Sequence, residues 1–182
     1  AAYFSRSRVS DDVRARPSDP QDLGYPSLAT FSIGARSNFA PATRGHLGFS
    51  PVIAMTGEAV IESQRVLQRV LQEFEGDVAL LVFPQSYHPR TLVILCMFYV
   101  TAETAQNQAV RRTFKRLVEV AAEHGWGEYR THTAFMDDCA RAYSFNDHAL
   151  LRLHETIKDA VDPNGVLSAG RYGIWPKHLR KA

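Results

Sequence analysis

Hydrophobic positions along this chain first form three runs of strand length, at 45–54, 78–83 and 91–100. Gly48 and Pro51 interrupt the first run, and a proline cannot donate to a strand ladder. We therefore expect the first strand to be bulged or to lie at a sheet edge. The second and third runs are separated only by a turn-rich stretch at 84–90, which predicts an antiparallel pair.

Two longer segments have the spacing of amphipathic helices. Thr56 is expected to cap the first of them, and Gly76 and Asp77 to end it. The second runs from about 103 to 124 and is expected to end at Gly125. The expected inner faces are Val60, Gln64, Leu67, Val70, Leu71 and Phe74 in the first helix, and Val110, Phe114, Leu117 and Ala121 in the second.

The order strand, helix, strand, strand, helix predicts an α+β fold. If the segment around Tyr129 adds a final strand, this order matches the split βαβ arrangement of ferredoxin-like domains. In that arrangement an antiparallel sheet carries both helices on one face. We therefore predict a ferredoxin-like antiparallel sheet with helices on one face, followed by a helical C-terminal segment.

The C-terminal part has a different pattern. A short helix is predicted at 135–143, and a second helix is predicted after Asn146 as its N-cap. An apolar stripe on the second helix is expected to be buried; it consists of Leu150, Leu153, Ile157 and Val161. A turn at 162–165 leads into a glycine-rich segment that we expect to be extended and close to a bulky group.

The predicted organisation has three parts. Residues 1–38 are rich in proline and arginine and form a loop-rich lead-in. Residues 39–131 form the ferredoxin-like domain, and residues 132–182 form the helical C-terminal segment. The chain begins with Ala1 and has no glycine-rich phosphate loop in its first stretch. We therefore expect it to be the later part of a longer protein.

Composition excludes several classes of function. The chain has 182 residues, 45% of them hydrophobic, and a net charge of +2, which is typical of a globular protein and too small to indicate nucleic acid. No apolar run approaches the roughly 20 residues that cross a bilayer, so no membrane partner is expected and a cytoplasmic location is predicted. Cys96 and Cys139 lack metal-ligand spacing, and we expect reduced, buried thiols and no metal site.

The segment 125–137 carries a phenol, a guanidinium and an imidazole within four residues. Arg130 stays charged at any working pH, and Tyr129 beside a cation ionises more easily than its reference pKa of about 10 suggests. Together they could hold and ionise a phenol. The alternative is structural: Tyr129 packs its ring on a helix, and Arg130 pairs with Glu128 or Asp137.

Three segments resemble the vanillyl-alcohol oxidase and p-cresol methylhydroxylase family of flavoenzymes, which oxidise para-substituted phenols. The C-terminal segment, residues 162–176, reads DPNGVLSAGRYGIWP and is similar to the family's C-terminal signature. The second segment, residues 125–132, reads GWGEYRTH, and the third, residues 45–51, reads GHLGFSP. The resemblance covers roughly 24–179 and is greatest to the eugenol-oxidase-like members.

The resemblance implies a role for each matching residue. Tyr129 and Arg130 would bind the phenolate oxygen of the substrate and serve as the catalytic pair. His46 would carry FAD covalently, as in the oxidase branch, where the methylhydroxylase branch uses a tyrosine. Arg171 would lie near N1 and O2 of the flavin. The substrate pocket would include Gly48 and Ser50.

The function implied is that of the substrate cap and C-terminal part of an FAD-dependent oxidase. Hydride would leave the benzylic carbon of a para-substituted phenol for flavin N5, with a quinone methide as product and O2 as electron acceptor. The implied partners are the N-terminal FAD-binding part of the same protein and further copies in a homodimer or larger oligomer. One alternative is a 4-alkylphenol dehydrogenase or hydroxylase subunit that passes electrons to a cytochrome. Another is a non-catalytic module that binds an aromatic ligand.

Overall fold

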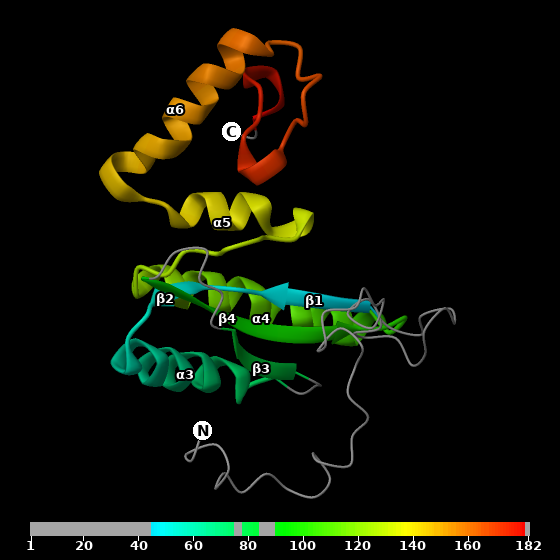
Figure 1. Cartoon of the computed structure of the whole chain (residues 1–182). Helices are drawn as coiled ribbons and strands as arrows, with labels where there is room; N and C mark the ends of the chain where they lie inside the picture. Colours follow the sequence, from blue (N-terminus) through cyan, green and yellow to red (C-terminus); the bar gives the residue numbers. More distant parts are fainter. Residues whose placement is uncertain (1–44, 75–77, 84–89, 181–182) are drawn as a thin grey trace, which may run out of the picture. The chain divides into compact units, whose positions relative to one another are not determined.

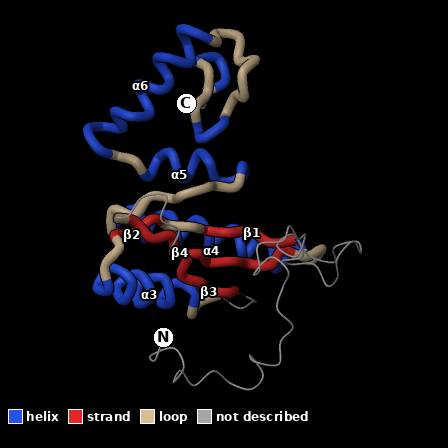
Figure 2. Tube along the Cα trace, in the orientation of Figure 1, coloured by secondary structure: helices blue, strands red, loops and turns tan. Residues whose placement is uncertain are grey.

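A computed structural model describes residues 45–74, 78–83 and 90–180 of the chain, so the predicted lead-in 1–38 lies outside the described residues. The strands are β1 (Gly45–Phe49), β2 (Val52–Ala54), β3 (Val78–Phe83) and β4 (Thr91–Val100). The helices are α3 (Gly57–Leu71), α4 (Thr104–Glu123), α5 (Met136–Ala142) and α6 (Phe145–Val161), with short 3-10 turns η3 (Thr133–Phe135), η4 (Arg171–Gly173) and η5 (Lys177–Leu179). Figures 1 and 2 show the strands forming one sheet beside α3 and α4. The predicted α+β class is confirmed.

β1 and β2 form one interrupted strand along the same edge of β4. Phe49 lies opposite Cys96 and Val52 lies opposite Val93, so both strands keep a single antiparallel register with β4. The interruption falls at Pro51, whose carbonyl still accepts from Ile94 N at 3.0 Å although its own nitrogen cannot donate. No extra residue shifts this register, so the strand is not bulged. Its outer side carries only one bridge within the described residues, so the expected edge position is confirmed.

The outer edge of this interrupted strand carries the start of a fourth strand. Its only ladder pair in the described part of the chain is the bridge between Pro51 and Glu128. Since β3 pairs with the other side of β4, the order across the sheet is the Glu128 segment, the interrupted strand, β4 and β3. That is the strand order of a split βαβ fold. The full ferredoxin-like sheet is thus present only in part, because its last strand is reduced to one bridge.

Helix α3 begins as predicted. The Thr56 hydroxyl accepts from Ala59 N at 3.2 Å, which satisfies one of the free amides of the first turn. The predicted inner face is largely confirmed, because Leu67 and Phe74 lie in the core and Val60, Val70 and Leu71 pack partly buried against it. Ser63 and Val66, which the prediction did not include, are also buried. Ser63 is tolerated there because its hydroxyl donates to the carbonyl of Val60 at 2.9 Å.

Helix α4 presents the predicted face, because Val110, Phe114, Leu117 and Ala121 are all buried. Phe114 is its central contact: its ring meets that of Phe49 edge-on at 5.4 Å and stacks on that of Phe135 at 3.9 Å. The aromatic pairs join the sheet, α4 and the turn before α5 into one core. Gly125 ends the helix with a left-handed φ of 73°, as the sequence predicted.

Two predictions about α6 are wrong in this chain. No residue of α6 is buried, and the predicted inner stripe is about half exposed or more, with Leu153 at 56% and Val161 at 67%. Asn146 is not an N-cap either, because its φ of 48° and ψ of 53° are left-handed, whereas a capping residue is extended. Instead, three consecutive residues adopt a left-handed turn with φ between 48° and 55°; they are Asn146, Asp147 and His148. These are the residue types that tolerate this conformation best after glycine.

The glycine-rich C-terminal segment folds back on α5. A Cβ on Gly173 would lie 2.5 Å from the Cβ of Ala140, so only glycine allows η4 to approach α5 this closely. A Cβ on Gly170 would collide with the ring of Trp175, which fits the predicted bulky neighbour. The expectation of an extended segment is wrong, because residues 166–170 form turns and η4 follows them. The Trp175 indole donates to Asp137 at 2.8 Å and so ties the tail to α5.

Three further predictions concern the cysteines, metals and membranes. Cys96 and Cys139 are buried free thiols, as predicted. Burial raises the pKa of Cys96 to about 12 and that of Cys139 to about 11, so both stay protonated at neutral pH. Among the described residues, no cluster of three histidine, cysteine or acidic side chains is placed to hold a metal. None of the helices in the described part has the length and apolar character needed to span a bilayer.

Candidate functional site

The interrupted edge strand carries three of the predicted site residues. His46, Gly48 and Ser50 alternate with the buried Leu47 and Phe49, so they share the face of the strand that points away from the core. His46 is exposed, and its imidazole has no hydrogen bond or ion pair with any residue of the described ranges. The structure thus places these three predicted site residues on one face.

Gly48 is constrained by its neighbour on β4. A Cβ at this position would lie 2.9 Å from Cδ1 of Leu95, closer than real side chains approach. A larger residue would therefore need the end of the Leu95 side chain to shift. The absence of a side chain at position 48 leaves space beside Leu95 on this face.

Tyr129 is held beside this face by backbone hydrogen bonds. Its N–H donates to the carbonyl of Ser50 at 2.8 Å, and Val52 N donates to the carbonyl of Gly127 at 2.9 Å. Because Pro51 lies opposite Glu128, Ser50 lies opposite Tyr129, and directly opposed residues of antiparallel strands point to the same face. Two segments distant in sequence therefore converge: the interrupted strand at Ser50 and the segment after α4.

The two glycines that flank Trp126 occur at their positions for different physical reasons. Gly125 needs its positive φ to end α4. Gly127 has room for no side chain, because a Cβ there would collide with the hydroxyl end of Tyr143. Together they let the chain turn from α4 directly onto the sheet edge and deliver Tyr129 opposite Ser50.

The structural alternative for Arg130 is not supported. The carboxylate of Glu128 accepts from Ser50 N at 2.8 Å, and that of Asp137 accepts from the Trp175 indole at 2.8 Å. Neither forms an ion pair with Arg130 within the described residues. Arg130 is exposed, and Tyr129 is 42% exposed, so the guanidinium can reach a ligand from the surface of the sheet edge.

A cavity of about 380 Å³ lies beside His46. Helix α4 contributes Arg111, whose guanidinium also lies 5.7 Å from the centre of the Phe135 ring, and the turn before α5 contributes His132. Nδ1 of His132 accepts from Ala134 N at 3.2 Å. Sequence reasoning missed Arg111, because helical spacing assigns it only to an outer face. The structure places this cation at the same cavity as His46.

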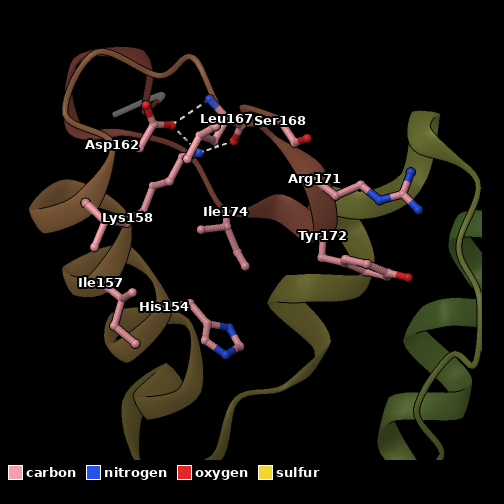
Figure 3. Close-up of a pocket in the computed structure, with 10 residues that line it drawn as sticks. His154, Ile157, Lys158, Asp162, Leu167, Ser168, Arg171, Tyr172 and Ile174 are labelled. Atoms are coloured by element: carbon pink, nitrogen blue, oxygen red, sulfur yellow. Dashed lines mark hydrogen bonds and ion pairs between the residues drawn. The ribbon is translucent and has the colours of Figure 1, made fainter.

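Arg171 lies at a different cavity, of about 310 Å³, between α6 and the C-terminal segment. Its guanidinium lies 5.1 Å from the ring centre of Tyr172, and Figure 3 shows both side chains extending away from α6. On the opposite side of the cavity, Lys158 and Asp162 form an ion pair at 2.6 Å. The structure therefore does not bring Arg171 to the cavity that His46 lines.

Glu128 is the residue that sequence reasoning did not single out as part of the site. Burial raises its pKa to about 7, although the hydrogen bond from Ser50 N opposes that rise. Its second oxygen, Oε1, is buried without a hydrogen-bond partner among the described residues. The residue Glu128 lines a cavity of about 240 Å³ together with Cys139 and Tyr143. In the sequence, only its position directly before Tyr129 indicates that Glu128 belongs to the site.

The chain is similar to flavin-linked enzymes. A family model described as FAD linked oxidases, C-terminal domain, matches residues 33–172. The chain is 27% identical to the flavoprotein subunit of 4-cresol dehydrogenase (hydroxylating) from Pseudomonas putida, over 71% of this chain and 24% of that protein.

Two solved structures are similar to this chain. One is 4-ethylphenol oxidase from Gulosibacter chungangensis in complex with isoeugenol, with a TM-score of 0.69 and 34% identity over 76% of this chain and 26% of that one. The other is p-cresol methylhydroxylase with substrate bound, with a TM-score of 0.64 and 26% identity over 72% of this chain and 24% of that one. The chain thus spans about a quarter of the length of these relatives.

Proposed function

We propose that this chain is the substrate-binding part of an oxidase of para-substituted phenols. The chain belongs to the family of FAD linked oxidases, C-terminal domain. Its resemblance to the vanillyl-alcohol oxidase and p-cresol methylhydroxylase flavoenzymes is confirmed. The observation that supports the proposal is the pairing of Tyr129 with Ser50, which holds Tyr129 on the face of His46 and Gly48.

Tyr129 and Arg130 are proposed to bind the substrate as its phenolate. A phenolate is expensive to bury without a compensating charge, and Arg130 supplies that charge while Tyr129 donates a hydrogen bond. Negative charge on the phenolic oxygen favours loss of a hydride from the benzylic carbon, since the remaining electrons delocalise into a quinone methide. The exposure of both residues supports this role, because neither is consumed by the core.

The residues at the cavity beside His46 fit the chemistry of the family's cofactor. The imidazole of His46 is not engaged by any described residue, and Arg111 offers a cation to an anionic or polar group. FAD, when bound, would supply the hydride acceptor. His46 would hold it covalently, and Gly48 and Ser50 would leave room for the phenol beside it. Arg171 is proposed to approach the flavin from the C-terminal segment.

The electron acceptor distinguishes two versions of this function. We propose O2, because a histidine at position 46 matches the oxidase branch. The similarity to a 4-cresol dehydrogenase subunit favours the second version, in which electrons pass to a cytochrome. Hydrogen peroxide formation by the complete protein, measured with and without an added cytochrome acceptor, separates the two.

The exposed apolar stripe of α6 supports a proposal about partners. Leu153 and Val161 are more than half exposed in this chain, whereas the similar proteins are about three times as long. We propose that the N-terminal FAD-binding part of the same protein covers this stripe. The complete protein is further proposed to form a homodimer or larger oligomer.

The test of the proposed function is anaerobic reduction of the flavin by 4-ethylphenol in the complete protein. Arg130→Ala should abolish phenol binding and reduction, whereas Arg130→Lys should retain some binding and react slowly, because lysine keeps the charge without the planar set of donors. Tyr129→Phe should slow reduction by about tenfold if its hydroxyl only donates a hydrogen bond, and by more if it takes part in deprotonation. Wild-type rates in both Tyr129→Phe and Arg130→Ala would remove the pair from the mechanism.

A further inference from the structure

The strand pairing at Tyr129 ends in an unusual way. In a regular antiparallel ladder, the N–H of Ser50 would donate to the carbonyl of Tyr129, in return for the bond that Ser50 accepts from Tyr129 N. The return bond is made instead to Oε2 of the Glu128 side chain, at 2.8 Å. The carboxyl group thus takes the place of a backbone carbonyl in the ladder.

This substitution has a consequence for the backbone that follows. Because Ser50 N is already satisfied by Glu128, the carbonyl of Tyr129 is not needed in the ladder, and the chain leaves the sheet in a bend at 129–130. Successive residues of an extended strand point to opposite faces. Tyr129 and Arg130 can therefore approach one oxygen atom only if regular pairing stops between them.

We infer that Glu128 is a positioning residue, whose side chain ends the last strand at Tyr129 and so sets the backbone from which Tyr129 and Arg130 reach a single phenolate oxygen. The inference rests on the proposed function of that pair. It assigns no contact between Glu128 and the substrate. Glu128 acts through Ser50 and through the bend.

The surroundings of Glu128 suit a group that holds a fixed position. Its carboxyl lies at a cavity with Cys139, Tyr143 and His154, and Oε1 is shielded from solvent. Burial raises its pKa to about 7, so below that pH the group is a neutral acid. A neutral carboxyl and a carboxamide have the same shape, and both present an oxygen that can accept from Ser50 N. Glutamine should therefore replace Glu128 without loss of position.

The experiment uses the complete protein and 4-ethylphenol as probe. Glu128→Gln should bind and react within about threefold of wild type, whereas Glu128→Ala should weaken binding and slow anaerobic flavin reduction by about tenfold or more, the factor that one hydrogen bond supplies. Glu128→Asp should resemble Glu128→Ala, because a side chain one carbon shorter does not reach Ser50 N. The exposed Glu73 provides a matched control, and Glu73→Ala should leave both values unchanged.

Hydrogen exchange gives a readout that does not depend on turnover. The amides of Ser50 and Tyr129 should lose protection in Glu128→Ala and keep it in Glu128→Gln, which also shows that the variants are folded. Two results would overturn the inference: binding and exchange that stay at wild-type values in Glu128→Ala, or equal losses in Glu128→Ala and Glu128→Gln. Failure of the proposed function is recognised separately, because Arg130→Ala would then bind 4-ethylphenol as wild type does.

Discussion

Single residues in this chain acquire their chemistry from groups that are distant in sequence. Glu128 has a pKa near neutrality because the core formed by β1, α4 and α5 excludes water around its carboxyl. His46 is an ordinary exposed histidine by its own burial, and only its place on the face of Gly48 and Ser50 makes it a candidate for flavin attachment. Two predictions follow at this scale.

Glu128 should make the stability of the chain depend on pH. The native state raises its pKa from 4.5 to about 7, so between these values the folded chain binds more protons than the unfolded chain. The free energy of unfolding should therefore decrease as pH rises through that window, by roughly 2 to 3 kcal/mol, and remain level above it.

Denaturation of wild type and Glu128→Gln at several pH values isolates this effect, because all other titrating groups are shared. The variant should lack the decrease between pH 4.5 and about 7. Parallel curves for the two proteins would mean that Glu128 ionises like an exposed carboxyl.

His46 should hold the flavin covalently in the complete protein. After acid precipitation, the yellow colour should stay with the wild-type protein and should be released from His46→Ala, since the variant has no nucleophilic nitrogen at this position. His178, which is also exposed, provides the control, and His178→Ala should keep the colour. Colour retained by precipitated His46→Ala would assign the attachment to another residue.

At the scale of elements, two helices of similar amphipathic pattern have different surroundings. Helix α4 packs its apolar face on the sheet, and Leu117 is fully buried there. Helix α6 has the same type of stripe, but it makes contact with α5 and the C-terminal segment without burying any residue. Helical periodicity alone therefore does not distinguish a face that is covered from one that is exposed.

Leucine-to-alanine substitutions in the two helices should measure this difference. Leu117→Ala should lower the free energy of unfolding by about 2 to 5 kcal/mol, because it leaves a cavity in the core. Leu153→Ala should change it by less than about 0.5 kcal/mol, because the side chain is 56% exposed. Helix propensity changes equally in both variants, so chemical denaturation compares burial alone. Equal losses would show that α6 is packed as tightly as α4.

At the scale of the whole molecule, the chain corresponds to only part of the length of its relatives. It spans about a quarter of the length of its relatives, and its predicted site residues occupy two cavities, one with His46 and one with Arg171. If the FAD-binding part covers α6, Leu153→Ala should destabilise the complete protein far more than it destabilises this chain. Thermal unfolding of the flavin-bound protein and of this chain, each with and without Leu153→Ala, measures this difference. A similarly small effect in both would mean that the FAD-binding part does not cover the stripe.

The sequence by itself determined the strands, the helices and the inner face of α4, because hydrophobic periodicity and glycine stops act within one element. It also singled out His46, Gly48, Ser50 and Tyr129, but that they share one face of the sheet edge follows only from the pairing of Pro51 with Glu128. Tertiary structure alone decided which apolar face is covered, which cavity receives Arg171 and that Glu128 replaces a backbone carbonyl. Periodicity indicates that a residue favours an apolar neighbour. Segments far along the chain supply that neighbour, and their packing excludes water.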